Sequence, residues 1–321
     1  CAPEDQAKGR ASTVVVMAAM VSCRPRVAPD MVTNLRRAGT GGQGERSPVG
    51  TVATSLAPSA GRSRTVTDDQ VRRLKSRTLA QRAELDLLRD FTRHPFADIT
   101  VPQRVEEVIA AVREEHLTYL REDDLRLLAE LVVEADRAGR EGMVVECGTA
   151  LGGSAIVMAA ARASGRPMRV FDVFGMIPPP TQEDGRDVHD RYEAIRRGES
   201  SGLGGQTYYG YREDLLGEVT ASFARHGVPV GENGVELVRG LFEDTVHIDG
   251  PVALAHLDGD WYASTRVCLE RVAPQVVPGG RILFDDYYHW SGARTATDEY
   301  FADRPGWRIE HRAKVHVVRE T

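Results

Sequence analysis

The chain has 321 residues, of which 41% are hydrophobic, and a formal net charge of −6 at pH 7. A chain of this length and composition can bury one substantial core. The mild acidic excess argues against a duplex nucleic-acid binder, which needs a basic surface. The apolar stretch at residues 13–21 is far too short to span a bilayer, and the acidic Glu4 and Asp5 before it are unlike a signal peptide. We therefore expect a cytoplasmic protein without membrane or nucleic-acid partners.

The composition changes sharply near residue 67. Residues 1–66 are rich in Ala, Gly, Ser, Thr, Pro and Arg and lack periodic apolar positions, so the sequence predicts a disordered or non-native extension there. Over residues 67–141 apolar residues recur at helical spacing, in 71–88, 105–120 and 122–138, which predicts a helical cap segment. The remaining part, residues 142–321, is the predicted ligand-binding domain, and it contains a lid-like insert at 176–211.

Strand-like and helical segments alternate from residue 142 onward. Strands separated by helices indicate an α/β fold with a mostly parallel, doubly wound sheet of the Rossmann type. Short apolar runs predict five strands, one helix and a terminal hairpin. The strands are expected at 142–147, 169–174, 235–240, 252–257 and 280–284, the helix at 154–163, and the hairpin at 307–312 and 314–318. Ligands of such a sheet bind at the carboxyl ends of its strands.

Acidic side chains follow two of these strands at their carboxyl ends. Asp258 and Asp260 come directly after the fourth predicted strand, and Asp285 and Asp286 after the fifth. We predict that Asp258, Asp285 and Asp286 bind Mg²⁺, which prefers oxygen ligands and would keep positions for two neighbouring hydroxyls of a sugar or catechol. Asp258 then contributes to catalysis, because such an ion fixes the acceptor oxygen and stabilises its alkoxide.

The exit of the first predicted strand, residues 146–154, is a glycine-rich turn followed by a helix. Glycines let the backbone approach a ligand closely, and the helix offers unpaired amides at its amino end. The spacing fails the G-x-G-x-x-G pattern of dinucleotide loops. With its acidic start it is similar to the methyltransferase loop that holds S-adenosylmethionine (SAM), although a plain tight turn is the alternative. Asp172 in the second strand suits the cofactor's ribose hydroxyls, and the predicted SAM contacts of this region are Glu146, Gly148, Thr149, Ala150, Ser154 and Asp172.

Five motifs in order resemble those of the macrocin O-methyltransferase (TylF-like) family. They lie at residues 145–148 with 152–154, 239–245, 257–265, 278–280 and 285–287. The resemblance covers about residues 105–305 and implies SAM- and magnesium-dependent methylation of sugar hydroxyls on macrolides and related natural products. It also implies cofactor contacts from Gly240 and Phe242, and from Thr118 and Tyr119, which resemble the family's short element that closes over SAM.

Two departures from the family pattern leave the acceptor open. Residues 171–175 replace the usual Asp-Ser-Phe-x-Gly, and the insert at 176–211 is longer and different. The prolines of the insert and its Tyr208, Tyr209 and Tyr211 predict a lid with aromatic surfaces for a sugar or polyketide, or else an oligomer contact. Four of its arginines fit either the diphosphate of a nucleotide-linked sugar or a solvated helix face, namely Arg186, Arg191, Arg196 and Arg197.

Methylation of a hydroxyl also requires a base that takes its proton. Asp260 and His289 are the candidates, because each lies within a few residues of a predicted metal ligand. The alternatives are that Asp260 caps the following helix and that His289 is a surface-loop histidine.

These features predict a SAM-dependent O-methyltransferase acting on a deoxysugar hydroxyl, on a glycosylated natural product or a nucleotide-linked sugar, in antibiotic biosynthesis. The expected partner is a sugar-bearing small molecule, and we expect a homo-oligomer. A catechol-type or phenolic acceptor is the alternative within this class. Two other classes stay open: a nicotinamide-dependent oxidoreductase, against which the missing phosphate loop argues, and a non-catalytic binding protein, which would not need the strand-end carboxylates.

Overall fold

The computed structural model describes residues 98–231 and 233–320. The predicted extension at 1–66 and the helix predicted over 71–88 lie outside these ranges. Within them, none of the helices has both the length and the apolar character that a bilayer crossing requires.

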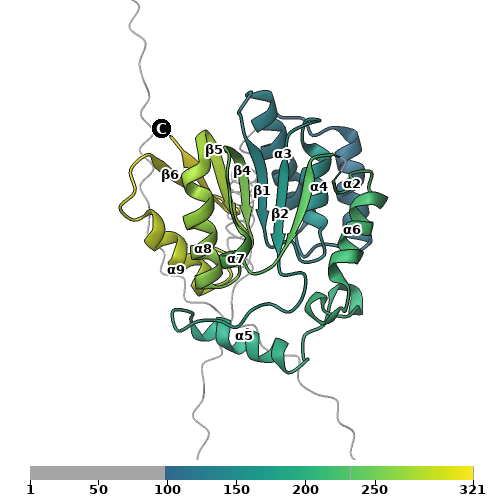
Figure 1. Cartoon of the computed structure of the whole chain (residues 1–321), viewed down its shortest axis with the longest axis vertical. Helices are drawn as coiled ribbons and strands as arrows, with labels where there is room; N and C mark the ends of the chain where they lie inside the picture. The colour runs from purple at the N-terminus through teal and green to yellow at the C-terminus, as the bar shows by residue number, and fades with distance from the viewer. Residues whose placement is uncertain (1–97, 232, 321) are drawn as a thin grey trace, which may run out of the picture. The chain divides into compact units, whose positions relative to one another are not determined.

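The described residues form a seven-stranded sheet in the order β3-β2-β1-β4-β5-β7-β6 (Figure 1). Strands β1 to β5 run parallel to one another, and β7 pairs antiparallel with both β5 and β6 at one edge. The strands are β1 (Met143–Cys147), β2 (Met168–Asp172), β3 (Val235–Arg239), β4 (Val252–Leu257), β5 (Val276–Phe284), β6 (Trp307–His311) and β7 (Val315–Arg319). The predicted α/β fold with a mostly parallel sheet is confirmed.

The two central strands are buried along their whole length, as continuous apolar runs of a parallel sheet should be. The order of the strands reverses between β1 and β4, and ligands of such sheets bind outside the carboxyl ends at this point. β2 ends two residues earlier than predicted. Its last residue, Asp172, accepts a hydrogen bond from the amide of Phe174 at 2.6 Å, and Phe174 itself has a left-handed φ of 46°, which ends the extended backbone.

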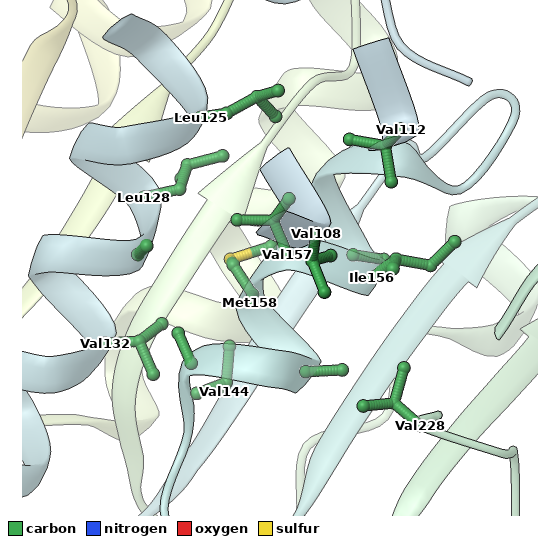
Figure 2. Packing of buried hydrophobic residues seen from close by; sticks show 14 of the residues in the cluster. Val108, Val112, Leu125, Leu128, Val132, Val144, Ile156, Val157, Met158 and Val228 are labelled. Atoms are coloured by element: carbon green, nitrogen blue, oxygen red, sulfur yellow. The ribbon is translucent and has the colours of Figure 1, made fainter. Parts of the chain in front are cut away.

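One face of the sheet is covered by α2 (Gln103–Glu114), α3 (Glu122–Arg137), α4 (Gly153–Ala161) and α6 (Leu215–Arg225). Figure 2 shows how apolar side chains of α2, α3 and α4 converge with β1. The labelled residues include Val108, Val112, Leu125, Leu128, Val132, Val144, Ile156 and Met158. α3 agrees with the helix predicted over 122–138, whereas α2 ends at Glu114, six residues before the end of the stretch predicted over 105–120. The buried stripes of both helices explain the apolar spacing.

The other face is covered by α7 (Phe242–Thr245), α8 (Tyr262–Val272) and α9 (Ser291–Phe301), with a short η3 turn (Ala273–Gln275) after α8. Cys147 of β1 and Cys268 of α8 are buried in this second apolar cluster as free thiols. Among the described residues, two apolar cores therefore cover the two faces of the sheet, which leaves its strand ends accessible to ligands.

The insert leaves the sheet after β2 and contains α5 (Arg186–Arg196), η1 (Leu203–Gly205) and η2 (Tyr209–Tyr211). Figure 1 shows α5 outside the two helical layers, across one end of the sheet. Two aspartates of the insert fix it there by accepting from backbone amides at the first turns of α8 and α9. Asp184 accepts from the amide of Tyr262 at 2.7 Å, and Asp187 accepts from the amide of Ser291 at 3.0 Å. The insert is thus placed over the carboxyl ends of the strands.

Candidate functional site

A glycine allows the exits of β1 and β4 to lie against each other. Gly148 has a φ of 89°, and a Cβ atom at this position would lie 1.9 Å from the carbonyl oxygen of Asp258. The amide of Asp258 in turn donates to the carbonyl of Cys147 at 2.8 Å. Only glycine tolerates both this conformation and this approach. The turn predicted from sequence therefore brings the backbone after β1 directly beside the first acidic residue after β4.

The carboxylate of Asp172 holds the same glycine turn from the β2 side. Oδ2 accepts from the amides of Thr149 at 2.8 Å and Ala150 at 3.1 Å, while Oδ1 accepts from Phe174. Burial raises the pKa of Asp172, although these three hydrogen bonds oppose the shift. Both oxygens are thus engaged with the backbone. The predicted contact of Asp172 with a ribose stays a prediction, and the structure adds a loop-holding role.

A first cavity opens beside this turn at the carboxyl ends of the strands. Five predicted cofactor residues contribute to its lining, namely Gly148, Ala150, Asp172, Gly240 and Phe242. Its wall also includes residues to which the sequence analysis gave no cofactor contact, among them Ile177, Pro178, Leu241, Glu243 and Ser264. The cavity lies where the strand order reverses, which is the expected ligand position of a doubly wound sheet.

The other predicted cofactor residues lie around this cavity and do not line it. Thr118 is buried and its hydroxyl accepts from the amide of Leu120 at 3.0 Å. Ser154 is buried in the first turn of α4, and Thr149 is buried in the turn that precedes this helix. Glu146 is fully buried and hydrogen-bonded to Nδ1 of His256 at 2.8 Å. Tyr119, by contrast, is half exposed and lines a second cavity.

The carboxylates of three aspartates converge just beyond the carboxyl ends of β4 and β5. Asp258, Asp260 and Asp286 each place an oxygen within 4.8 Å of the others. Asp260 joins them because its backbone is left-handed, with a φ of 56°, and its amide donates to Oδ2 of Asp286 at 3.2 Å. Burial and repulsion from neighbouring carboxylates raise the pKa of all three. We call Asp258, Asp260 and Asp286 the acidic trio.

Asp285, the third ligand predicted from sequence, points to other partners. Its carboxylate pairs with Nζ of Lys314, and Nε2 of His256 lies 3.9 Å from Oδ1. Burial would raise the pKa of Asp285, but these two cationic partners hold it below its usual range. An oxygen of Asp260 thus lies within 4.8 Å of oxygens of Asp258 and Asp286, and Asp285 lines the second cavity with all three. Metal binding by Asp285 stays a prediction. Asp285 and Asp286 lie in the bend that follows β5, and their carboxylates have different partners.

The alternative that Asp260 caps helix α8 is not what the structure shows. The N-cap of α8 is Trp261, without a side-chain cap bond, and Asp184 accepts from the first helical amide instead. Sequence reasoning missed Asp184, and its separation of 78 residues from Tyr262 leaves no local signal. It also missed Lys314 and His256, although a histidine and a lysine in apolar surroundings are unusual enough to have been noticed.

A second cavity of about 760 Å³ shares part of its wall with the first. The shared residues are Ala150, Ile177, Tyr209, Asp258 and Asp260. Its volume lies in the upper range of small-molecule sites, which leaves room for more than a single sugar. Aromatic residues contribute much of the wall, namely Tyr119, Tyr208, Tyr209, Trp261, Tyr288 and Trp290. His289 is exposed and lies in the same wall.

The four arginines of the insert divide into two groups. Arg186, Arg196 and Arg197 form surface ion pairs with Asp190, Glu193 and Glu199, as a solvated helix face would. Arg191 instead lines the second cavity, where its guanidinium lies over the ring of Tyr208 at 5.7 Å and donates to Ser200 at 2.9 Å. The insert thus contributes aromatic and cationic groups to the cavity. An oligomer contact of the insert stays a prediction.

Comparison with known proteins identifies relatives of this chain. A relative from Streptomyces olivaceus, the 8-demethyl-8-(2,3-dimethoxy-alpha-L-rhamnosyl)-tetracenomycin-C 4'-O-methyltransferase, is 36% identical over 173 residues, which is 52% of this chain. The chain covers 60% of that relative, so it spans less than two thirds of its length. The Mycinamicin III 3''-O-methyltransferase of Micromonospora griseorubida is 29% identical over 194 residues, 57% of this chain and 68% of the relative.

A solved structure shows the same fold. The O-methyltransferase NovP superposes with a TM-score of 0.54 at 23% identity, over 74% of this chain and 99% of that chain. The sequence profile of the family described as Macrocin-O-methyltransferase (TylF) matches residues 115–306, which is more than half of the chain. The chain therefore belongs to the macrocin-O-methyltransferase (TylF) family.

Proposed function

We propose that the protein is a SAM-dependent O-methyltransferase that acts on a deoxysugar hydroxyl of a glycosylated natural product in antibiotic biosynthesis. One observation carries this proposal: the two cavities share Asp258 and Asp260. A methyl donor in the first cavity and an acceptor in the second would meet at the acidic trio. The Streptomyces olivaceus relative is named for a rhamnosyl-bearing tetracenomycin, which supports a glycoside as the acceptor.

The first cavity suits SAM better than a dinucleotide. SAM carries no phosphate, so it needs close approach to the backbone rather than a phosphate-binding glycine loop. The turn at Gly148 provides that approach, and Gly240 and Phe242 complete the wall. Methyl transfer requires an in-line arrangement of donor and acceptor, so the rate depends largely on how the two cavities position them.

The acidic trio fits a divalent cation. Asp286 is buried and Asp258 and Asp260 are partly buried, and carboxylates whose oxygens lie within 4.8 Å of one another repel each other unless a positive charge is placed among them. Mg²⁺ prefers oxygen donors and binds through a few carboxylates and additional oxygen ligands. We therefore propose that Asp258, Asp260 and Asp286 hold Mg²⁺. When bound, the ion would supply Lewis-acid stabilisation of the acceptor oxygen.

His289 is the base that this arrangement favours. It lies exposed in the wall of the second cavity, whereas Asp260 belongs to the trio and would bind the proposed cation there. Histidine is the side chain that most often serves as a general base in enzymes. We propose that His289 receives the proton of the acceptor hydroxyl, and that the aromatic wall orients the rest of the glycoside.

A methyl-transfer assay tests the proposal. Purified protein is incubated with SAM, Mg²⁺ and a panel of deoxysugar glycosides, nucleotide sugars and catechols, and products are screened by mass for the gain of one methyl group. We expect methylation of a glycoside, its loss in excess EDTA, and its recovery with Mg²⁺. Asp286→Asn should lose turnover while SAM affinity measured by calorimetry is largely kept, and the exposed Arg186→Gln serves as the control. Full turnover in excess EDTA would remove the metal, and methylation of catechols alone would shift the acceptor class.

A further inference from the structure

The wall of the second cavity contains one basic side chain that has no carboxylate partner among the described residues. Two arginines and one lysine of the described residues line this cavity, namely Arg121, Arg191 and Lys314. Arg121 forms an ion pair with Asp124 at 3.0 Å, and Lys314 forms one with Asp285. Arg191 lies on α5 of the insert, is partly buried, and forms no ion pair with any described carboxylate. A cation in such a wall favours a bound molecule that brings a negative charge.

The hydrogen-bond and ring partners of Arg191 are neutral. Its Nη1 donates to the hydroxyl of Ser200 at 2.9 Å, and its guanidinium carbon lies 5.7 Å from the ring centroid of Tyr208. Burial raises the pKa of Tyr208 and of Tyr209, so both phenols stay protonated and do not balance the arginine. A guanidinium is a planar fork of several N–H donors, and among the described residues Ser200 accepts from this one. The remaining donors can bind an oxyanion of a ligand in the cavity.

Arg191 also acts on the carboxylates of the cavity, but only through space. It is one of the charges that oppose the rise in the pKa of Asp260, which burial causes first and neighbouring carboxylates increase. Asp258, Asp260, Asp285 and Asp286 lie at the strand ends, whereas Arg191 lies on the insert. An anionic group is therefore attracted to the insert side and repelled from the strand ends, whichever of these carboxylates bind a metal ion. These charges would orient an acidic acceptor with its neutral sugar hydroxyl toward the strand ends.

Aromatic rings lie beside Arg191 in the same wall. The rings of Tyr208 and Tyr209 lie 4.4 Å apart, and the ring of Tyr119 lies 6.2 Å from that of Tyr209, edge to face. All three tyrosines line the second cavity. Aromatic faces and the plane of a guanidinium both stack on flat ring systems. A diphosphate carries more than one negative charge, and sites for it usually add backbone amides of a helix amino terminus or a loop. One arginine among tyrosines thus suits a single charge on a flat aglycone better than the diphosphate of a nucleotide-linked sugar.

We propose that Arg191 selects a glycoside whose flat aglycone carries a single negative charge, a carboxylate or an ionised phenol, and binds that charge while the sugar hydroxyl faces the strand ends. This inference deepens the proposed function and rests on it. Arg191 is then a specificity-determining residue for the acceptor. An arginine that only fastened α5 to the segment at Ser200 would affect every acceptor equally.

A pair of acceptors that differ only in charge tests this assignment on the full chain. The probes are a carboxynaphthyl rhamnoside and the corresponding carboxamide, each of which joins a deoxysugar to a flat aglycone. Methyl transfer from SAM is measured with each probe for the wild type, Arg191→Gln and Arg191→Lys, and SAM affinity is measured by calorimetry. We expect the wild type to prefer the carboxylate by about tenfold in kcat/KM, as a hydrogen bond to a charged group predicts.

Arg191→Gln should raise the KM for the carboxylate about tenfold and leave its kcat and the SAM affinity unchanged. Its KM for the carboxamide should stay within about twofold of the wild-type value, because no charge is bound there. Arg191→Lys should keep a smaller preference for the carboxylate, because it retains the charge without the planar fork. Arg196→Gln removes an exposed charge from the same helix and should match the wild type. An equal rise of both KM values in Arg191→Gln would reduce Arg191 to a structural contact and overturn the proposal.

Three other outcomes are decisive. If Arg191→Gln does not fold, the wild type and Arg191→Lys carry the test, and equal kcat/KM values for the two probes would overturn the inference. A higher kcat/KM for thymidine diphosphate rhamnose than for either glycoside, lost in Arg191→Gln, would assign the arginine to a diphosphate instead. Methylation of a neutral glycoside with no effect of position 191 contradicts the inference alone. Absence of methyl transfer to any glycoside, nucleotide sugar or catechol defeats the proposed function and the inference with it.

Discussion

The close approach at Gly148 predicts a large effect from a single methyl group. Gly148→Ala places a Cβ atom 1.9 Å from the carbonyl oxygen of Asp258, so that carbonyl has to move by about 1 Å to reach even a tight contact of 3.0 Å. The left-handed φ of 89° costs an alanine about 1 to 2 kcal/mol. Overpacking of this kind adds about 1 to 3 kcal/mol. The free energy of unfolding should therefore fall by about 2 to 5 kcal/mol.

Gly165→Ala is a matched control for the backbone contribution. Gly165 has the same φ of 89°, but nothing lies within 4 Å of its hypothetical Cβ atom. This variant should lose only the conformational share, about 1 to 2 kcal/mol. The difference between the two variants isolates the contact with Asp258.

Urea-induced unfolding and SAM titration calorimetry measure the two consequences. Gly148→Ala should lose more stability than Gly165→Ala and should also bind SAM more weakly, because the displaced Asp258 lies in the walls of both cavities. Gly165→Ala should bind SAM like the wild type. Equal losses of stability in both variants, with SAM affinity unchanged in Gly148→Ala, would refute the argument that this turn brings the cofactor loop and the acidic trio together.

Three further predictions concern a loop, a buried histidine and the amino-terminal segment. Asp172→Asn should weaken SAM binding by about 1 to 3 kcal/mol. It should also lower the melting temperature of the free protein, because the carboxylate accepts hydrogen bonds from three backbone amides. If Asp172 served only as a ribose contact, the melting temperature of the free protein would not change. His316 is fully buried, and burial together with Arg281 and Arg312 lowers its pKa from 6.5 to about 3. As the pH falls below 6.5, the unfolded chain therefore binds a proton at His316 that the folded chain does not bind. The stability that the neutral, buried His316 contributes is complete above pH 6.5 and is lost as the pH falls toward 3. His316→Leu should flatten the pH dependence of the unfolding free energy between these values by up to about 1.4 kcal/mol per pH unit, and identical slopes in urea unfolding would contradict this. Deleting residues 1–66 should change neither melting temperature nor turnover, because their composition supports no core or ligand contact; a folded but inactive truncated protein would assign them a role at the site.

The alternation of elements could be predicted from local sequence because each strand is a short apolar run between breaking residues. The strand expected at 252–257 is observed with the same bounds, and the hairpin expected near the end of the chain is formed by β6 and β7. Burial on both faces imposes such runs on a parallel strand, whatever its neighbours are. The position of Gly148 also followed from local reasoning, since a glycine after a buried strand usually marks a close backbone approach.

The partners of the carboxylates could not be predicted in this way. Sequence spacing placed Asp285 beside Asp286 as a ligand, but spacing contains no information about Lys314, which reaches Asp285 from 29 positions later through the β5–β7 pairing. Asp260 joins the trio only because its backbone turns left-handed next to Asp286. Such contacts depend on register and on a single φ angle.

The sequence by itself determined which segments are strands, which end of the sheet carries the chemistry, and which residue types are available there. Local hydrophobic patterning and the rule that ligands bind at the carboxyl ends of parallel strands are sufficient for that. Only the tertiary structure decided that Asp258, Asp260 and Asp286 converge, that Lys314 compensates Asp285, and that Asp184 and Asp187 hold the insert over the site. The physical reason is that charge pairing acts between side chains that folding brings within a few ångströms, at any separation along the chain.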